Sequence, residues 1–369
     1  MPRAAYLDWN ATAPVRPEVA AAMAEALARC GNPSSVHRFG RAARQALEAA
    51  RAEVAALIGA APGEIVFTSG GTEANQLALR GLKGRRLLVS ALEHDSVRQV
   101  APEAEPIPAT PTGVVDLAAL ERMLAGGAAV VSLMLANNET GAIQPVADAA
   151  RLAHAHGALL HCDAVQAAGK IPVAIGALGA DLLSLSAHKL GGPQGVGALA
   201  VRDAVPLAAR QTGGGQERGR RAGTENLPGI VGFGLACRIA AERLEEGASV
   251  ERLRDLAERR LAAIAPEAPI YAREVPRLPN TLSIGMPNVP ASTQVMALDL
   301  AGVMVSAGAA CSSGKLRRSA VLDAMGVPPE AAESAIRISL GWSTVEADID
   351  QLVDAWGALY VRLRARSAA

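Results

Sequence analysis

One stretch of the chain places an amine directly after a buried strand. The apolar run 181–185 predicts a strand, and Lys189 follows it after three further residues. A lysine in such a position costs free energy if its amine has no partner. Its amine can reach solvent along its flexible stem, or it can form an imine with a carbonyl compound in a low-dielectric site. The residues that follow the other predicted strands distinguish between these two interpretations.

A glycine turn forms a second candidate site. Residues 64–68 predict a strand, residues 73–80 predict a helix, and the turn 69–72 with Gly71 and Thr72 joins them. A helix that begins there offers backbone N–H groups and a positive dipole end to an anion such as phosphate. The turn matches neither the dinucleotide-binding nor the P-loop motif. An ordinary glycine-containing turn is the alternative.

Further polar residues follow other predicted strands. His94 comes after strand 86–90, Asn138 after strand 128–135, and Asp163 after strand 158–162. Strands separated by helices predict a doubly wound, mostly parallel sheet. Because ligands bind at the carboxyl ends of such strands, we expect these residues to meet Lys189 at one edge.

One cofactor would satisfy an anion site, an amine, a carboxylate and an imidazole together, namely pyridoxal phosphate. Four residues would bind its phosphate: Gly71, Thr72, Ser186 and His188. Lys189 would form an imine with the aldehyde, and Asp163 would keep the ring nitrogen protonated. Gln166 would hydrogen-bond the ring oxygen, and His94 would lie over the ring face. Taken alone, His94 would be interpreted as a surface or hydrogen-bonded structural histidine.

Cys311 lies among small residues, in the segment 306–314. Such a segment cannot pack a core, so we expect a mobile segment with an accessible thiol. Three basic residues within 315–318 would favour the thiolate. An incidental exposed cysteine is the alternative. Arg337, on the predicted strand 334–340, is suited to bind a carboxylate through both ends of its guanidinium.

Composition excludes several other classes of protein. Apolar residues make up 50% of the 369 residues, and 36 basic residues balance 36 acidic ones. Neither a nucleic-acid partner nor a membrane span is expected. The four cysteines form no CxxC pair, so no metal site is predicted, and Cys162 and Cys237 are expected in the core. We expect a soluble, cytoplasmic protein.

The chain resembles the cysteine desulfurases of the NifS/IscS type, which are fold-type I pyridoxal phosphate enzymes of the class V aminotransferase family. The resemblance spans nearly the whole length, and its motifs occur in the family's order. These motifs are residues 7–8 with 11–14, 31–35 with His37, 68–73, 93–94, 137–139 with Gly141, 163–164 with Gln166, 186–189 with 192–193, 213–218 with 223–224, and 308–313.

The resemblance implies two α/β domains and two subunits. Residues 1–247 would form the large cofactor-binding domain, with a doubly wound, mostly parallel sheet. Residues 248–369 would form a smaller C-terminal domain that carries the Cys311 loop, with the N-terminal arm, about residues 1–15, packed against it. Thr224 would complete the phosphate site of the neighbouring subunit, which implies a homodimer.

The resemblance also implies a reaction. L-cysteine would become L-alanine, and its sulfur would pass to Cys311 as a persulfide for an acceptor protein, for example in iron–sulfur cluster assembly. Lys189 would remove the α-proton, with His94 as a further catalytic residue. Asn138 and Arg337 would bind the substrate carboxylate, with Asn138 also at the cofactor. The alternatives are a selenocysteine lyase, another pyridoxal phosphate lyase or aminotransferase, and a sulfur-trafficking module with a structural cofactor.

Overall fold

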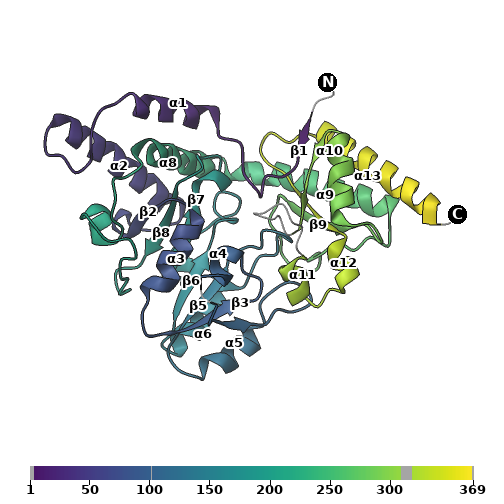
Figure 1. Cartoon of the computed structure of the whole chain (residues 1–369), viewed down its shortest axis with the longest axis horizontal. Helices are drawn as coiled ribbons and strands as arrows, with labels where there is room; N and C mark the ends of the chain where they lie inside the picture. Colours follow the sequence, from purple (N-terminus) through teal and green to yellow (C-terminus); the bar gives the residue numbers. More distant parts are fainter. Residues whose placement is uncertain (1–3, 101, 309–317, 368–369) are drawn as a thin grey trace.

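A seven-stranded sheet is the central element of the computed structural model, which describes residues 4–100, 102–308 and 318–367 (Figure 1). In spatial order the strands are β2 (Ile65–Thr68), β8 (Gly197–Val201), β7 (Leu182–Ser186), β6 (Leu159–Asp163), β5 (Ala129–Met134), β3 (Arg86–Ser90) and β4 (Glu105–Ile107). Strand β8 runs antiparallel to both of its neighbours, and the other pairs are parallel. The predicted mostly parallel sheet is confirmed.

Helices cover both faces of this sheet. They are α1 (Pro17–Leu27), α2 (Arg38–Leu57), α3 (Gly71–Gly81), α4 (Asp95–Arg98), α5 (Leu117–Leu124), α6 (Val146–Ala155), α7 (Ile175–Leu178) and α8 (Leu227–Glu242). Along β7, Leu183 and Leu185 join a core with α2, α6 and α8, whereas Leu182 joins a second core with α3. Successive side chains of a strand point to opposite faces, so the continuous apolar run reflects burial on both.

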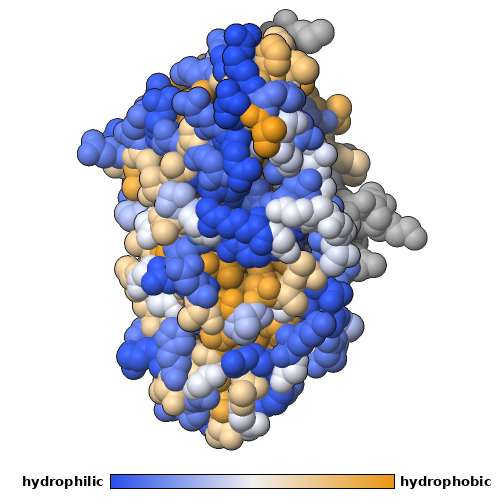
Figure 2. Space-filling view, turned by 90° about the vertical axis from the view of Figure 1, so that its left-hand side faces the viewer, coloured by the Kyte–Doolittle hydropathy of each residue, from blue (hydrophilic) through white to orange (hydrophobic). Residues whose placement is uncertain are grey.

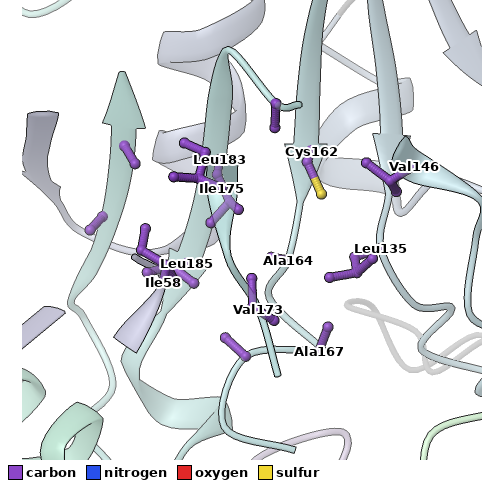
Figure 3. Close-up of a cluster of buried hydrophobic side chains, with 14 of the residues drawn as sticks. Ile58, Leu135, Val146, Cys162, Ala164, Ala167, Val173, Ile175, Leu183 and Leu185 are labelled. Carbon is purple, nitrogen blue, oxygen red and sulfur yellow. The ribbon is translucent and has the colours of Figure 1, made fainter. Parts of the chain in front are cut away.

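The larger core contains two cysteines. Figure 3 shows Cys162 among Leu135, Val146 and Ala164, and its side chain is fully buried. Cys237, on α8, is buried as well. Both cysteines therefore act as small apolar residues, as predicted.

Two smaller sheets are formed mainly by later residues. Strand β11 (Ser306–Ala307), β12 (Ala335–Ser339) and β9 (Thr281–Gly285) form an antiparallel sheet, and β1 (Ala5–Tyr6) pairs in parallel with β10 (Val303–Met304). The helices here are α9 (Gly247–Ile264), α10 (Ala291–Leu300), α11 (Ala320–Ala324), α12 (Pro329–Glu333) and α13 (Glu346–Ser367). Helices α9, α10 and α13 surround a separate apolar core, whereas α11 and α12 contribute to a smaller one. The domain boundary at residue 247, where α9 begins, stays a prediction.

The short run 303–307 is divided between two strands in different sheets. Strand β10 pairs with β1, whereas β11 pairs with β12, and Val305 lies between them. Partner choice is not visible in such a short run, so the sequence does not predict this division. None of the helices within the described ranges is long and apolar enough to span a membrane.

Candidate active site

A cavity of about 970 Å³ lies at the carboxyl ends of the central strands. Ten of the residues predicted to form the site line it: Gly71, Thr72, His94, Asn138, Asp163, Gln166, Ser186, His188, Lys189 and Arg337. Nine of these lie at or just beyond the carboxyl ends of β2, β3, β5, β6 and β7, which share one edge because these strands run in the same direction. Arg337 comes from β12 of the antiparallel sheet.

The two remaining predicted site residues are Thr224 and Cys311. Thr224 is exposed in the loop that precedes α8. Cys311 lies outside the described residues. Gly308 and Arg318, the nearest described residues on either side of it, both line the cavity.

Lys189 ends a single helical turn, Ala187–Lys189, that follows β7. Its Nζ donates hydrogen bonds to the backbone oxygens of Asn10 at 2.5 Å and Ala11 at 2.8 Å. Burial lowers the pKa of Lys189 to about 8, the Arg337 guanidinium acts in the same direction, and Asp8 and Asp163 oppose it. Near neutral pH about a tenth of this amine is therefore uncharged, far more than for a lysine in solvent, and this fraction can act as a nucleophile or base.

Asp163 is held by two hydrogen bonds. Its Oδ1 accepts from Val165 N at 2.9 Å, and its Oδ2 accepts from Asn75 Nδ2 at 2.8 Å. Burial raises the pKa of the neighbouring Glu93 well above its usual value, and the charge of Asp163 raises it further. Burial and the charge of Asp163 therefore both favour the neutral form of Glu93.

Asn75 is a cavity residue that the sequence analysis missed. It is fully buried on α3, four residues after Gly71, and its amide also donates to Ser96 Oγ at 2.9 Å. Residues four apart share one helix face. This spacing was the signal that could have identified it.

His94 is the N-cap residue of α4 and contributes to the cavity wall. The backbone N–H of Ser96 donates to its Nδ1 at 3.0 Å, and Ser96 Oγ lies 2.8 Å from the same atom. Because Nδ1 accepts a hydrogen bond, neutral His94 carries its proton on Nε2.

Arg337 is only 3% exposed and contacts the N-terminal segment. Its Nη2 donates to Asp8 Oδ1 at 2.7 Å and its Nη1 to the backbone oxygen of Asn138 at 3.1 Å. A carboxylate is thus already bound at the guanidinium that was predicted to bind the substrate carboxylate. Asp8 was not among the predicted site residues, since 329 residues separate it from Arg337.

The anion site comprises the start of α3 and the turn after β7. Helix α3 begins at Gly71 without a side-chain cap, which leaves first-turn N–H groups for a ligand. Burial lowers the pKa of His188 to about 4, with Lys189 contributing, so His188 is neutral at pH 7. Neutral imidazole still has one N–H to donate to an anion.

These residues fit pyridoxal phosphate. The amine of Lys189 and the carboxyl group of Asp163 line the same cavity as the uncapped start of α3. The amide nitrogen of Gln166 has one protein acceptor, the Asn10 backbone oxygen at 3.0 Å, among the described residues, so its second N–H is available to a ligand. These groups therefore match the aldehyde, ring nitrogen, phosphate and ring oxygen of this cofactor.

Comparisons with known proteins agree with this geometry. The model of the aminotransferase class-V family matches residues 5–352. A cysteine desulfurase of Cereibacter sphaeroides is 46% identical over 98% of this chain and 97% of its own, and the cysteine desulfurase IscS of Dictyoglomus turgidum is 40% identical over 99% and 96%. The solved structure of a NifS-like protein from Rickettsia africae aligns with a TM-score of 0.91 and 36% identity, covering 97% of this chain and 99% of that one. The chain therefore belongs to the aminotransferase class-V family.

Proposed function

We infer that the chain is a cysteine desulfurase that uses pyridoxal phosphate. The observation that carries this inference is a single cavity lined by Lys189, Asp163 and Arg337. Relatives named cysteine desulfurase match nearly the full length of the chain. The reaction converts L-cysteine to L-alanine and transfers the sulfur to Cys311.

The bound cofactor withdraws electrons from the α-carbon of the substrate. Asp163 pairs with the ring nitrogen, and Gly71, Thr72, Ser186 and His188 bind the phosphate. The uncharged amine of Lys189 takes the α-proton, since its pKa of about 8 suits a base near neutral pH. Asn138 and Arg337 bind the substrate carboxylate, with Arg337 exchanging Asp8 for the substrate. His94, which lines the cavity, would lie over the cofactor ring and has its Nε2–H available as a donor.

Sulfur transfer is assigned to Cys311. Its thiolate attacks the substrate sulfur, a sulfur–sulfur bond forms, and the carbon–sulfur bond breaks. The electron pair of that bond stays with the carbon, which is protonated on the way to alanine. Gly308 and Arg318, the described residues that flank the segment containing Cys311, both line the cavity, which supports this assignment.

The decisive variant is Cys311→Ala. The purified variant should bind pyridoxal phosphate with the wild-type visible spectrum, yet release no sulfide from L-cysteine in the presence of a thiol reductant. Cys30→Ala is the matched control, because Cys30 is an exposed free thiol outside the cavity, and it should retain wild-type release. Normal sulfide release by Cys311→Ala would contradict the assignment.

A selenocysteine lyase or an aminotransferase is the second candidate within this fold. No contact in the described residues favours either one over the desulfurase. Alanine formation from L-cysteine and L-selenocysteine, measured side by side with the same preparation, separates the lyase. Amino-group transfer to a 2-oxo acid would identify an aminotransferase.

The assembly, location and partner belong to the same proposal. A homodimer would allow the exposed Thr224 to reach the phosphate site of the other subunit. Figure 2 shows hydrophobic residues gathered in a hollow on the face that forms the left-hand side of Figure 1, and such a surface suits a protein partner. The persulfide would be passed in the cytoplasm to an acceptor protein, with iron–sulfur cluster assembly as one destination.

A further inference from the structure

Lys170 is a buried cation that the proposed reaction does not use. It follows β6 by seven residues and contacts Gln166, which lines the cavity. Its Nζ donates to two uncharged oxygens, Asn10 Oδ1 at 2.9 Å and Gln166 Oε1 at 2.8 Å. Burial lowers the pKa of Lys170 well below its usual value, and Lys189 and Arg337 add to this effect. No ion pair to Lys170 is found within the described part of the chain. Burying this amine therefore costs free energy, and we expect a role that offsets this cost.

The contact with Gln166 determines which way its amide faces. Gln166 is 7% exposed, its Oε1 accepts from Lys170, and its Nε2 donates to the Asn10 backbone oxygen at 3.0 Å. A flipped amide would place its oxygen against that carbonyl oxygen and lose the bond from Lys170. Lys170 therefore keeps the N–H side of Gln166 toward the cavity.

Lys170 also contacts the side chain of Asn10, the residue whose backbone oxygen accepts from Gln166. Asn10 Oδ1 accepts from Lys170 and from Asn280 Nδ2, which holds the side chain in one orientation. The backbone oxygen of Asn10 is the acceptor for Lys189. One amine thus positions both the residue that faces the ring oxygen and the segment that faces Lys189.

We propose that Lys170 is a positioning residue that orients Gln166 so that an N–H, rather than a carbonyl oxygen, faces the ring oxygen of the cofactor. This proposal rests on the proposed function. The ring oxygen carries negative charge, and a donor stabilises that charge most once the proton shared with the Lys189 nitrogen has left. Loss of the donor should therefore raise the pH at which the visible absorbance of the bound cofactor changes.

The experiment is a double-mutant cycle on the holoenzyme, read by this absorbance midpoint. Lys170→Met and Gln166→Met should each raise the midpoint by about one pH unit, because both remove the same N–H contact. The double variant should show no further rise. Lys83→Met, which removes an exposed surface lysine, should leave the midpoint unchanged.

The charged groups around Lys189 are Arg337, Asp8, Asp163 and Lys170, and the cycle separates their effects from that of the amide. Additive rises in the double variant would mean that Lys170 acts through its charge, which would overturn the proposal. An unchanged midpoint in Lys170→Met would overturn it as well. A wild-type protein that binds no cofactor would instead contradict the proposed function.

A second variant decides the question if Lys170→Met does not fold, as judged by circular dichroism. Lys170→Arg keeps a group that can only donate hydrogen bonds, so it should retain the wild-type midpoint. A midpoint raised as far as that of Gln166→Met would overturn the proposal. The dissociation constant of pyridoxal phosphate gives an independent measure, with about a tenfold loss expected for Lys170→Met and wild-type affinity for Lys170→Arg.

Discussion

The reactivity of Lys189 arises from its surroundings. Its Nζ is bonded to two backbone oxygens rather than to a carboxylate, and burial is the largest influence on it. Carbonyl dipoles stabilise an ammonium less than a full negative charge does, so they do not offset the desolvation cost. On the surface the same lysine would keep its usual pKa of about 10.4, so its uncharged fraction at neutral pH would be smaller by roughly a hundredfold or more.

The first prediction concerns the pH dependence of cofactor binding by the apoprotein. Only an uncharged amine attacks an aldehyde, so the association rate should rise about tenfold per pH unit below pH 8 and level off above it. Stopped-flow absorbance with pyridoxal phosphate measures this rate, and N-acetyl-lysine methyl ester corrects for titration of the cofactor itself. A corrected rate that still rises at pH 10 would show that the pKa of Lys189 is not lowered.

At the scale of elements, helix α2 anchors the loop that contains Thr224. Arg51 on α2 donates through Nη1 and Nη2 to Glu217 at 2.7 and 2.9 Å, and Phe67 N on β2 donates to the same carboxylate at 2.9 Å. Glu217 and Arg218 have φ angles of 47° and 59°, a left-handed conformation that is unfavourable for residues other than glycine. The buried ion pair therefore holds the loop in a backbone conformation that the sequence does not favour.

Removal of the arginine should destabilise the protein strongly. Arg51→Met leaves the carboxylate of Glu217 buried without its partner, which typically costs about 3–5 kcal/mol of unfolding free energy. Arg29→Met is the matched control, since Arg29 and Glu25 form an ion pair with side chains 71% and 73% exposed, and it should change stability by less than about 1 kcal/mol. Urea unfolding followed by circular dichroism measures both. Equal losses of unfolding free energy in the two variants would show that burial does not determine how much the Arg51–Glu217 ion pair contributes to stability.

At the scale of the whole molecule, the cavity is assembled from segments that are far apart in the chain. Asn10, in the N-terminal segment, donates to Thr281 Oγ1 at 2.9 Å and to Ser339 Oγ at 3.0 Å, and its carbonyl oxygen accepts from Lys189. The small sheets are thereby linked to the edge of the central sheet. Any separation of these parts would move the acceptors of Lys189.

A mixed-dimer experiment tests the proposed two-subunit site. Lys189→Ala and Thr224→Val chains carry different tags, are expressed together, and the mixed dimer is isolated. If Thr224 acts on the other subunit, one of the two sites regains both residues, and about half of the wild-type activity should return at limiting cofactor. Activity no higher than that of the Thr224→Val protein would place both residues in the same subunit, and a monomer by light scattering would exclude the arrangement.

Sequence patterns alone predicted strands β2, β3, β5, β6, β7 and β12 and the edge of the sheet where the polar residues meet. These follow from local periodicity and from strand direction, and the ten predicted residues that line one cavity show how far that reasoning reaches. Only the tertiary structure decided the partners: Asp8 for Arg337, Asn75 for Asp163, the Asn10 carbonyl for Lys189, and the division of residues 303–307 between two sheets. Contacts across tens to hundreds of residues depend on how separate elements pack, and no spacing along the chain encodes that packing.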